Sequence, residues 1–234
     1  MRHVFDYIRK SKPLLFLIIG GFIYHMLIIL PSGSYLCYQT TCGIFFWGAH
    51  QHDAIWHLAI ANLAFLHTPF IVPFFSGAFL SGYNYLMDLI VFLISRLGLS
   101  AGLVYFKILP LLWFFLLVSI GLVFCRKVTR QISFAWFFIF LVLFGGSFGY
   151  FLTLYHGQTL KNAAGMLSMQ AGLTLANLQF AFSLVAVICL FIIFLKKQLD
   201  KRVSLMVGLL LFIIIGLKFY AGVISIFLVF VYYG

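Results

Sequence analysis

Residues 101–125 read AGLVYFKILPLLWFFLLVSIGLVFC, and Lys107 is their only charged residue. A helix crosses the hydrocarbon core of a bilayer with about 17–25 mostly apolar residues, so we expect this segment to span a membrane. Similar apolar stretches cover residues 14–30, 132–150, 180–195 and 203–217, and residues 223–233 could return as a further helix. We therefore predict an all-α polytopic membrane protein with about five or six transmembrane helices, because helices satisfy their own backbone hydrogen bonds in lipid.

Charged residues are few and unevenly placed. Apolar residues form 65% of the 234 positions and charged residues 8%, whereas soluble domains carry about 25% charged residues. The net charge is +11, and most basic residues lie in three short clusters beside predicted spans, at residues 2–12, 126–130 and 196–202. Membrane proteins keep such clusters on the cytoplasmic side, whereas a nucleic-acid binder needs one exposed basic face. We therefore expect an inner-membrane or plasma-membrane protein with a cytoplasmic N-terminus and no nucleic-acid partner.

The distribution of charge also assigns the two sides of the membrane along the chain. Residues 31–83 contain no Lys or Arg, and we place residues 31–100 outside as one long loop. If residues 84–97 crossed the membrane, the basic cluster at 126–130 would lie outside, against the charge rule. We therefore expect residues 53–67 and 84–97 to form two interfacial helices, ahead of a helical bundle over residues 101–234. The whole chain is then one transmembrane domain, and its end without a polar tail suggests the front portion of a longer protein.

The cysteines, four in number, are too few for a disulfide scaffold. Cys125 and Cys189 fall in predicted spans, where we expect them to act as small hydrophobic residues. Cys37 and Cys42 belong to the outer loop, where an oxidising compartment permits a disulfide. The sequence CYQTTC leaves both a closed disulfide and two free thiols open.

Asp53 is the acidic residue best placed for chemistry. It opens a predicted helix in the string HQHDAIWH at residues 50–57, within the outer loop. A carboxylate there can cap the helix, which is worth about 1 kcal/mol, or act as a catalytic base. With His50, His52 and His57 it could also bind a divalent metal such as zinc or manganese, although the spacing matches no established zinc signature. Capping, catalysis and metal binding therefore all stay open for this string.

Several longer motifs resemble parts of a known family. The outer loop has DAIWHLAIANLAF at residues 53–65, followed by the Pro- and Gly-rich PFIVPFFSGAFLSGYNY at residues 69–85. The segment QAGLTLANLQFAFS at residues 170–183 and the turn at residues 218–222 have similar counterparts. Together these motifs resemble the GT-C superfamily of polytopic glycosyltransferases, which take sugars from polyprenyl-phosphate donors, and the likeness covers most of the chain.

The resemblance implies a reaction and roles for individual residues. Asp53 would act as general base on an acceptor hydroxyl, on the extracytoplasmic side. Many members have two adjacent acidic residues at this point, whereas His52 precedes Asp53 here. Members also usually have more spans and often a soluble outer domain. The residues expected to contact substrate are His52, His57, Tyr83, Asp88, Arg96, Gln170 and Lys218; Arg96, Lys161 and Lys218 are the cations that could face the leaving phosphate.

The expected partners are a polyprenyl-phosphate-linked sugar donor, membrane lipid, and an acceptor glycan, lipid or protein. No cofactor is expected other than the divalent metal that the histidine string leaves open. Two other functions fit the same spans. A lipid or sugar transporter or flippase would carry polar residues or broken helices near the membrane midplane, and a non-catalytic membrane subunit could keep the family's shape.

Overall fold

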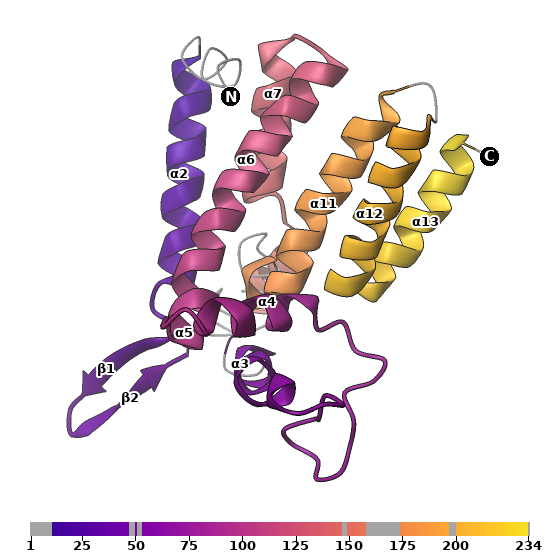
Figure 1. The fold of residues 1–234 in the computed structure, drawn as a ribbon. Helices are drawn as coiled ribbons and strands as arrows, with labels where there is room; N and C mark the ends of the chain where they lie inside the picture. Colours follow the sequence, from indigo (N-terminus) through magenta and orange to yellow (C-terminus); the bar gives the residue numbers. More distant parts are fainter. Residues whose placement is uncertain are drawn as a thin grey trace.

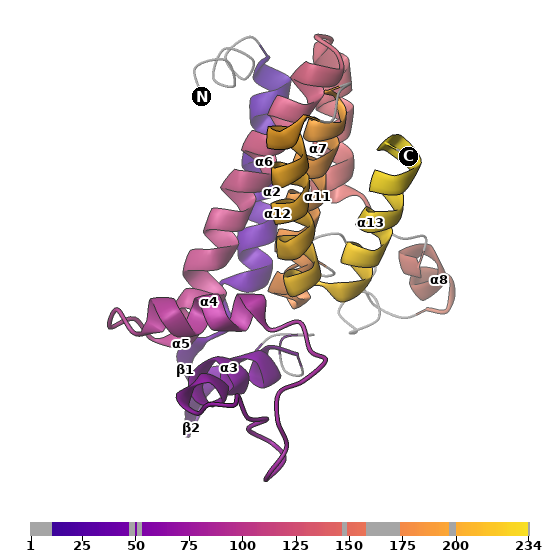
Figure 2. The same cartoon turned by 45° about the vertical axis from the view of Figure 1, so that its right-hand side comes forward.

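A computed structural model describes residues 11–46, 50, 53–146, 149–157, 174–196 and 200–233 (Figure 1). The described chain is mostly helical, and its longer helices stand side by side as a bundle (Figures 1 and 2). Among the described helices, Lys12–Ile29 and the continuous helix Ala101–Val128 are long and apolar enough to cross a membrane. His52, Lys161 and Gln170, which the sequence singles out, lie outside the described residues.

The chain builds a bundle and a set of smaller elements at one end of it. The bundle contains α2 (Lys12–Ile29), α5 (Ala101–Leu103), the π turn η3 (Val104–Ile108), α6 (Leu109–Val128), α7 (Ile132–Phe144), α11 (Leu178–Phe194), α12 (Lys201–Leu217) and α13 (Phe219–Tyr233), with α8 (Gly149–Tyr155) beside it. Between α2 and α5 lie β1 (Ser34–Tyr38), β2 (Thr41–Phe45), α3 (Asp53–Leu63), η2 (Ala64–Leu66) and α4 (Leu86–Ser95). In both views α3 and α4 lie across the end of the bundle where α2 ends and α5 begins, which we call the foot.

The apolar stretches predicted from the sequence form helices, with one error of length. The stretches at 14–30, 101–125, 180–195 and 203–217 lie on α2, α5 to α6, α11 and α12, and α13 covers residues 223–233. The stretch predicted over residues 132–150 is too long, because α7 ends at Phe144 and the next helix starts at Gly149. Gly145 has a ψ of 150°, outside the helical range, and the adjacent pair Gly145 and Gly146 has low helix propensity.

Side-chain caps start four of the bundle helices. Each cap accepts a hydrogen bond from the backbone N–H three residues later, which satisfies a group that the helix itself leaves free and contributes about 1 kcal/mol. The caps are Ser11 for α2, Ser100 for α5, Asn177 for α11 and Asp200 for α12, at 3.3, 3.2, 3.1 and 2.7 Å.

The helix from Ala101 to Val128 widens just before Pro110. Proline has no backbone N–H and its ring clashes with the carbonyl four residues earlier, so it disrupts a regular α-helix. Residues Val104–Ile108 form a π turn here, and the Leu109 N–H donates to the Val104 carbonyl five residues earlier. The wider turn lets one apolar helix continue through the proline.

The interior of the bundle is apolar and centres on α6. Trp113 is fully buried there, and its Nε1–H donates to the Ala181 carbonyl of α11 at 2.8 Å. This bond satisfies the indole's one polar group, so the ring gains the full benefit of burial, which is on the order of 2–3 kcal/mol. A second apolar cluster joins α11, α12 and α13 around Leu190, Val207 and Ile214.

A β-hairpin at the foot shows that the protein is not all-α as predicted. Strands β1 and β2 pair antiparallel, with Ser34 opposite Phe45 and Cys37 opposite Cys42. A disulfide joins Cys37 to Cys42, so the closed loop is the alternative that the structure contains. Because its apolar residues face both sides without alternating, the segment gives no period-two pattern in the sequence.

Lys107, the one charged residue of the stretch 101–125, fastens the base of this hairpin. Its Nζ donates to the Leu30 carbonyl at the end of α2 and to the Ser32 carbonyl and Ser34 Oγ, the last two at 2.9 Å. The carbonyls at a helix C-terminus lack partners within the helix and favour a positive charge. Lys107 therefore ties the end of α2, the start of β1 and the long helix together.

We expect Gly33→Ala to lower the free energy of unfolding by about 2–4 kcal/mol, from left-handed strain plus overpacking. Gly33 has a φ of 72°, and a Cβ there would overlap the Phe106 ring. The matched control is Gly43→Ala in β2, where a Cβ meets no atom within 4 Å and the change should stay within about 0.5 kcal/mol. Denaturation curves of the two purified variants test this, and equal midpoints would contradict it.

Candidate functional site

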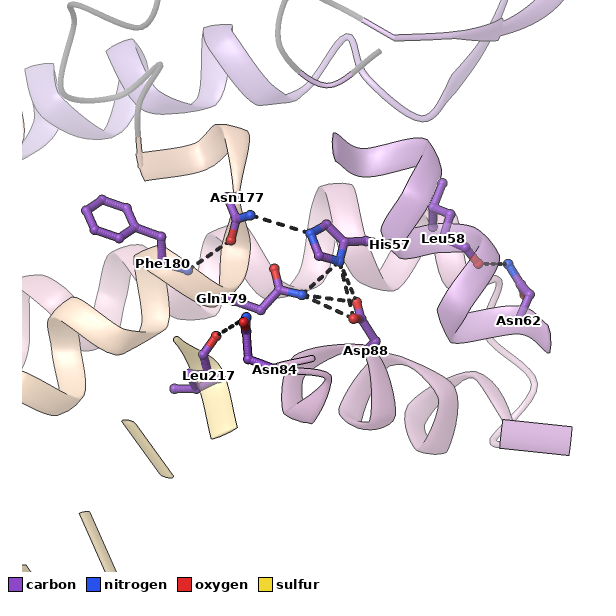
Figure 3. A network of polar contacts seen from close by, with 9 residues as sticks. All are labelled: His57, Leu58, Asn62, Asn84, Asp88, Asn177, Gln179, Phe180 and Leu217. Atoms are coloured by element: carbon purple, nitrogen blue, oxygen red, sulfur yellow. Dashed lines mark hydrogen bonds and ion pairs between the residues drawn. The ribbon is translucent and has the colours of Figure 1, made fainter. Parts of the chain in front are cut away.

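A buried polar cluster lies where α3, α4 and the start of α11 meet at the foot (Figure 3). Helix α3 supplies His57, α4 supplies Asp88, and the first turn of α11 with its cap supplies Gln179 and Asn177. His57 is 2% exposed, and Asp88 and Gln179 are fully buried. Polar side chains this deep require partners, because each unmatched group costs about 1–3 kcal/mol.

The Asp88 carboxylate is the centre of the cluster. His57 Nδ1 lies 3.0 Å from Oδ1 and 3.2 Å from Oδ2 of Asp88. Gln179 Nε2 lies 3.2 Å from each of the same two oxygens. The two nitrogens converge on one carboxylate from different helices, 2.8 Å apart.

Asn177 contacts the second ring nitrogen of His57. The Asn177 Oδ1 accepts from the Phe180 N–H as the cap of α11, at 3.1 Å, so its amide nitrogen is the atom that faces His57 Nε2, at 3.4 Å. A carboxylate can only accept, so Nδ1 carries a proton and donates to Asp88. The Gln179 amide nitrogen, 2.8 Å from Nδ1, is a second donor to the same carboxylate.

Burial raises the pKa of Asp88 above its ordinary value. The hydrogen bond and charge of His57, the hydrogen bond from Gln179 and the charge of Lys218 each work against that rise. Among the described residues the partner within ion-pair distance is His57. Asp88 is thus a buried acid held by neighbouring donors instead of by a contacting Lys or Arg.

Asp53, Tyr83 and Lys218 surround the same end of α3 and α4. Asp53 is exposed as the first residue of α3. Burial raises the pKa of Tyr83, and the charges of Asp88 and Asp53 raise it further. Burial lowers the pKa of Lys218, while the same two carboxylates act to raise it. An exposed acid and a half-buried ammonium therefore lie within each other's electrostatic reach.

An apolar groove opens beside this end of the two helices. Its volume is about 580 Å³, and its walls include Tyr83, Tyr85, Leu89, Phe212, Ile215 and Phe219. Gly216 and Phe219, which flank Lys218 in the sequence, both line it. The Asn84 side-chain amide donates to the Leu217 carbonyl at 2.9 Å and joins the start of α4 to the end of α12 (Figure 3). Lys218 is thus close in the sequence to residues that line the apolar groove.

Arg96 lies apart from the other predicted substrate-binding residues. It follows the last turn of α4, eight positions beyond Asp88, with its guanidinium carbon 4.6 Å from the centre of the Phe92 ring. Eight helical residues cover about 12 Å. Arg96 lines a separate pocket of about 280 Å³ with Asn62 and Ser100. Of the two candidate phosphate-binding cations that the structure describes, Arg96 and Lys218, Lys218 is therefore the one near Asp53.

The histidine string does not gather as a metal centre within the described part of the chain. His50 lies between the Ser32 hydroxyl, at 2.7 Å, and the Leu175 carbonyl, at 2.9 Å. Burial lowers the pKa of His50. His57 is bound to Asp88 and Asn177, and no group of three His, Cys, Asp or Glu side chains meets among the residues described. His50, Asp53 and His57 therefore do not fit a shared divalent metal.

Two residues of the cluster were not singled out from the sequence. Asn177 and Gln179 both lie in the motif QAGLTLANLQFAFS. The sequence does contain a sign of them, because two amide side chains precede a long apolar run. A helix N-cap accounts for Asn177 but not for Gln179. The second amide is fully buried, and a buried amide indicates a polar partner elsewhere in the fold.

Comparison of the chain with protein-family models, with curated proteins and with solved structures found no match. A function for the protein therefore has to rest on the residues at the foot and their geometry.

Proposed function

We propose that the chain is a multi-pass protein of an inner or plasma membrane, with the foot on the extracytoplasmic side. Arg126 and Lys127 end α6, and Lys201 and Arg202 start α12, at the end of the bundle away from the foot (Figure 1). Basic residues favour the cytoplasmic side, which supports this orientation. The disulfide of the foot supports it independently, because disulfides persist in oxidising compartments.

In the proposed arrangement five helices cross the bilayer, namely α2, α5 to α6, α7, α11 and α12, and α13 is the sixth if it also crosses. Large apolar side chains are exposed on the outside of these helices, among them Phe16 at 72%, Leu205 at 75%, Phe212 at 70% and Phe230 at 71%. Soluble monomers rarely expose apolar patches beyond a few hundred Å². Lipid tails would cover these side chains without cost.

We infer that the protein is a glycosyltransferase that moves a sugar from a polyprenyl-phosphate donor to an acceptor hydroxyl. The observation that carries this proposal is the meeting of Asp53, Lys218 and the apolar groove at one end of α3 and α4. The groove suits part of a hydrocarbon chain, Lys218 suits the phosphate, and Asp53 is an exposed base within electrostatic reach of that cation.

The chemistry follows from these three features. The acceptor hydroxyl gives its proton to an Asp53 carboxylate oxygen while its own oxygen attacks the anomeric carbon of the sugar. The bond between that carbon and the phosphate oxygen breaks, and the polyprenyl phosphate leaves with the electron pair. The Lys218 ammonium stabilises the negative charge that develops on the phosphate.

The buried cluster of His57, Asp88 and Gln179 has a positioning role in this proposal. It joins α3, α4 and α11 beneath the surface that Asp53 occupies, one helical turn before His57. Fixing the base relative to the donor removes part of the entropic barrier to reaction. These side chains are too buried to contact an acceptor.

A transfer assay in proteoliposomes tests the proposed function against its two alternatives. The purified protein is given a radiolabelled polyprenyl-phosphate sugar and a mixture of envelope glycans and lipids as acceptors. Label moving to an acceptor supports a glycosyltransferase. Label that crosses the vesicle membrane while still attached to the polyprenyl lipid would indicate a flippase. Label that neither reaches an acceptor nor crosses the membrane would indicate a non-catalytic subunit.

Lys218→Gln should raise the KM for the donor by about 10–100-fold, because a hydrogen bond to a charged group contributes about 1.5–3 kcal/mol. The matched control is Lys127→Gln, which removes an exposed ammonium at the opposite end of the bundle and should leave the KM unchanged. Initial rates at varied donor concentration measure both values. An unchanged KM for the Lys218 variant would remove this residue from the phosphate site.

A further inference from the structure

The hairpin of β1 and β2 leaves apolar side chains bare on both of its faces. Tyr35 and Ile44 are opposite each other and 70% and 61% exposed, whereas Leu36 and Tyr38 point to the other side and are 50% and 79% exposed. Residues 34–45 contain no charged side chain. A lone two-stranded hairpin is marginally stable in water, and bare apolar surface of this kind marks a place of contact.

The position of the hairpin restricts what can cover it. It begins just after α2 ends, and Lys107 fastens its base to that end. Its strands run sideways from the foot, away from the bundle, instead of continuing along the axis of α2 (Figure 1). The exposed apolar side of α2, with Ile23 at 52%, Leu27 at 68% and Leu30 at 44%, leads directly to this base. A bilayer around α2 would therefore have its surface at the level of the hairpin.

We propose that the hairpin lies in the headgroup layer of the outer leaflet and forms a lateral contact between the foot and the membrane. This inference rests on the membrane placement proposed above. Tyrosine and other aromatic residues prefer that layer. Water and headgroups there supply partners for the backbone groups on the free edge of each strand, which hydrocarbon cannot do.

A protein strand is the competing occupant, and it covers less of the exposed surface. Strand addition would satisfy the backbone groups along one edge of the hairpin. It would leave Tyr35 and Ile44 on one face, and Leu36 and Tyr38 on the other, still bare. The headgroup layer covers both faces and both edges, and the Cys37–Cys42 disulfide keeps the hairpin closed within it.

Fluorescence quenching tests this placement. An NBD fluorophore is attached through p-acetylphenylalanine at Tyr38, a substitution that keeps an aromatic ring and avoids thiol exchange with the disulfide. The full chain is reconstituted in phosphatidylcholine vesicles with doxyl-labelled lipid or with iodide on both sides. The same label at Phe75, exposed in the loop before α4, is the matched aqueous control, and the label at Ile23 reports on α2.

The Tyr38 label should be quenched by doxyl lipid, and its iodide quenching constant should be about fivefold smaller than that at Phe75, because the headgroup layer limits access of the anion. Iodide quenching equal to that at Phe75 would overturn the inference, and so would protection from both quenchers, which indicates a protein partner. If the Ile23 label escapes doxyl lipid, the membrane placement itself fails. If Ile23 is quenched and Tyr38 is not, only the hairpin inference fails.

Discussion

Asp53→Asn is expected to reduce the rate of sugar transfer by about 10²–10⁴-fold, which is the usual contribution of a general base. Asparagine has nearly the shape of aspartate but cannot accept the acceptor's proton at neutral pH. The substitution should also leave the fold intact, because asparagine is well tolerated at a helix N-terminus. A loss of transfer with an unchanged thermal unfolding curve would therefore report on chemistry.

The rate is measured as single-turnover transfer with saturating enzyme in excess over the labelled donor, so that binding does not limit it. Asp53→Glu keeps the base with a longer reach and should retain part of the activity. Asp200→Asn replaces the cap of α12 at the opposite end and serves as the control for loss of one negative charge. Transfer by Asp53→Asn at the wild-type rate would mean that another group takes the proton.

Asp88→Ala is expected to lower the free energy of unfolding by about 3–5 kcal/mol, the cost of breaking a buried charged pair. The Nδ1–H of His57 and the amide of Gln179 would both lose their acceptor in a site that water does not reach. Asp200→Ala removes a helix cap with one accepted hydrogen bond and should cost only about 1 kcal/mol. Denaturation midpoints of the two variants provide the comparison.

A combined variant separates lost hydrogen bonds from lost volume. Replacing His57 with Phe, Asp88 with Leu and Gln179 with Leu removes donors and acceptor together, and buried networks replaced in this way often regain stability. We expect the triple variant to be more stable than Asp88→Ala. If the single variant unfolds at the wild-type midpoint, Asp88 does not hold α3, α4 and α11 together.

The helices could be predicted from the sequence because each corresponds to one continuous apolar stretch of residues. Apolar runs of sufficient length identify α2, the helix through Pro110, α11, α12 and α13 wherever they pack. The end of α7 was placed too late, since Gly145 and Gly146 lie in an apolar setting that a hydropathy average extends across. The hairpin was missed because residues 34–45 are apolar on both faces and lack alternation.

The site was only half predictable for a different reason. Asp53 and Lys218 stand out because ionisable residues are scarce in this composition. The contacts of Asp88 could not be predicted in this way, because its partners His57 and Gln179 lie 31 and 91 positions away in the sequence. Local spacing along one helix carries no information on contacts between helices. Tertiary packing alone brings the carboxylate to its donors.

The π turn ahead of Pro110 determines the direction in which the side chains before it point around the helix axis. Each residue of a helix turns the chain by about 100°, so the extra residue in Val104–Ile108 rotates the upstream side chains by about that angle relative to an unbroken α-helix. Trp113, after the turn, faces α11, while Lys107, within the turn, faces the end of α2. Deleting one residue from the turn would keep the helix but swing the ammonium away from the carbonyls that it joins. The proline thus sets the angular offset between the middle of the bundle and its foot.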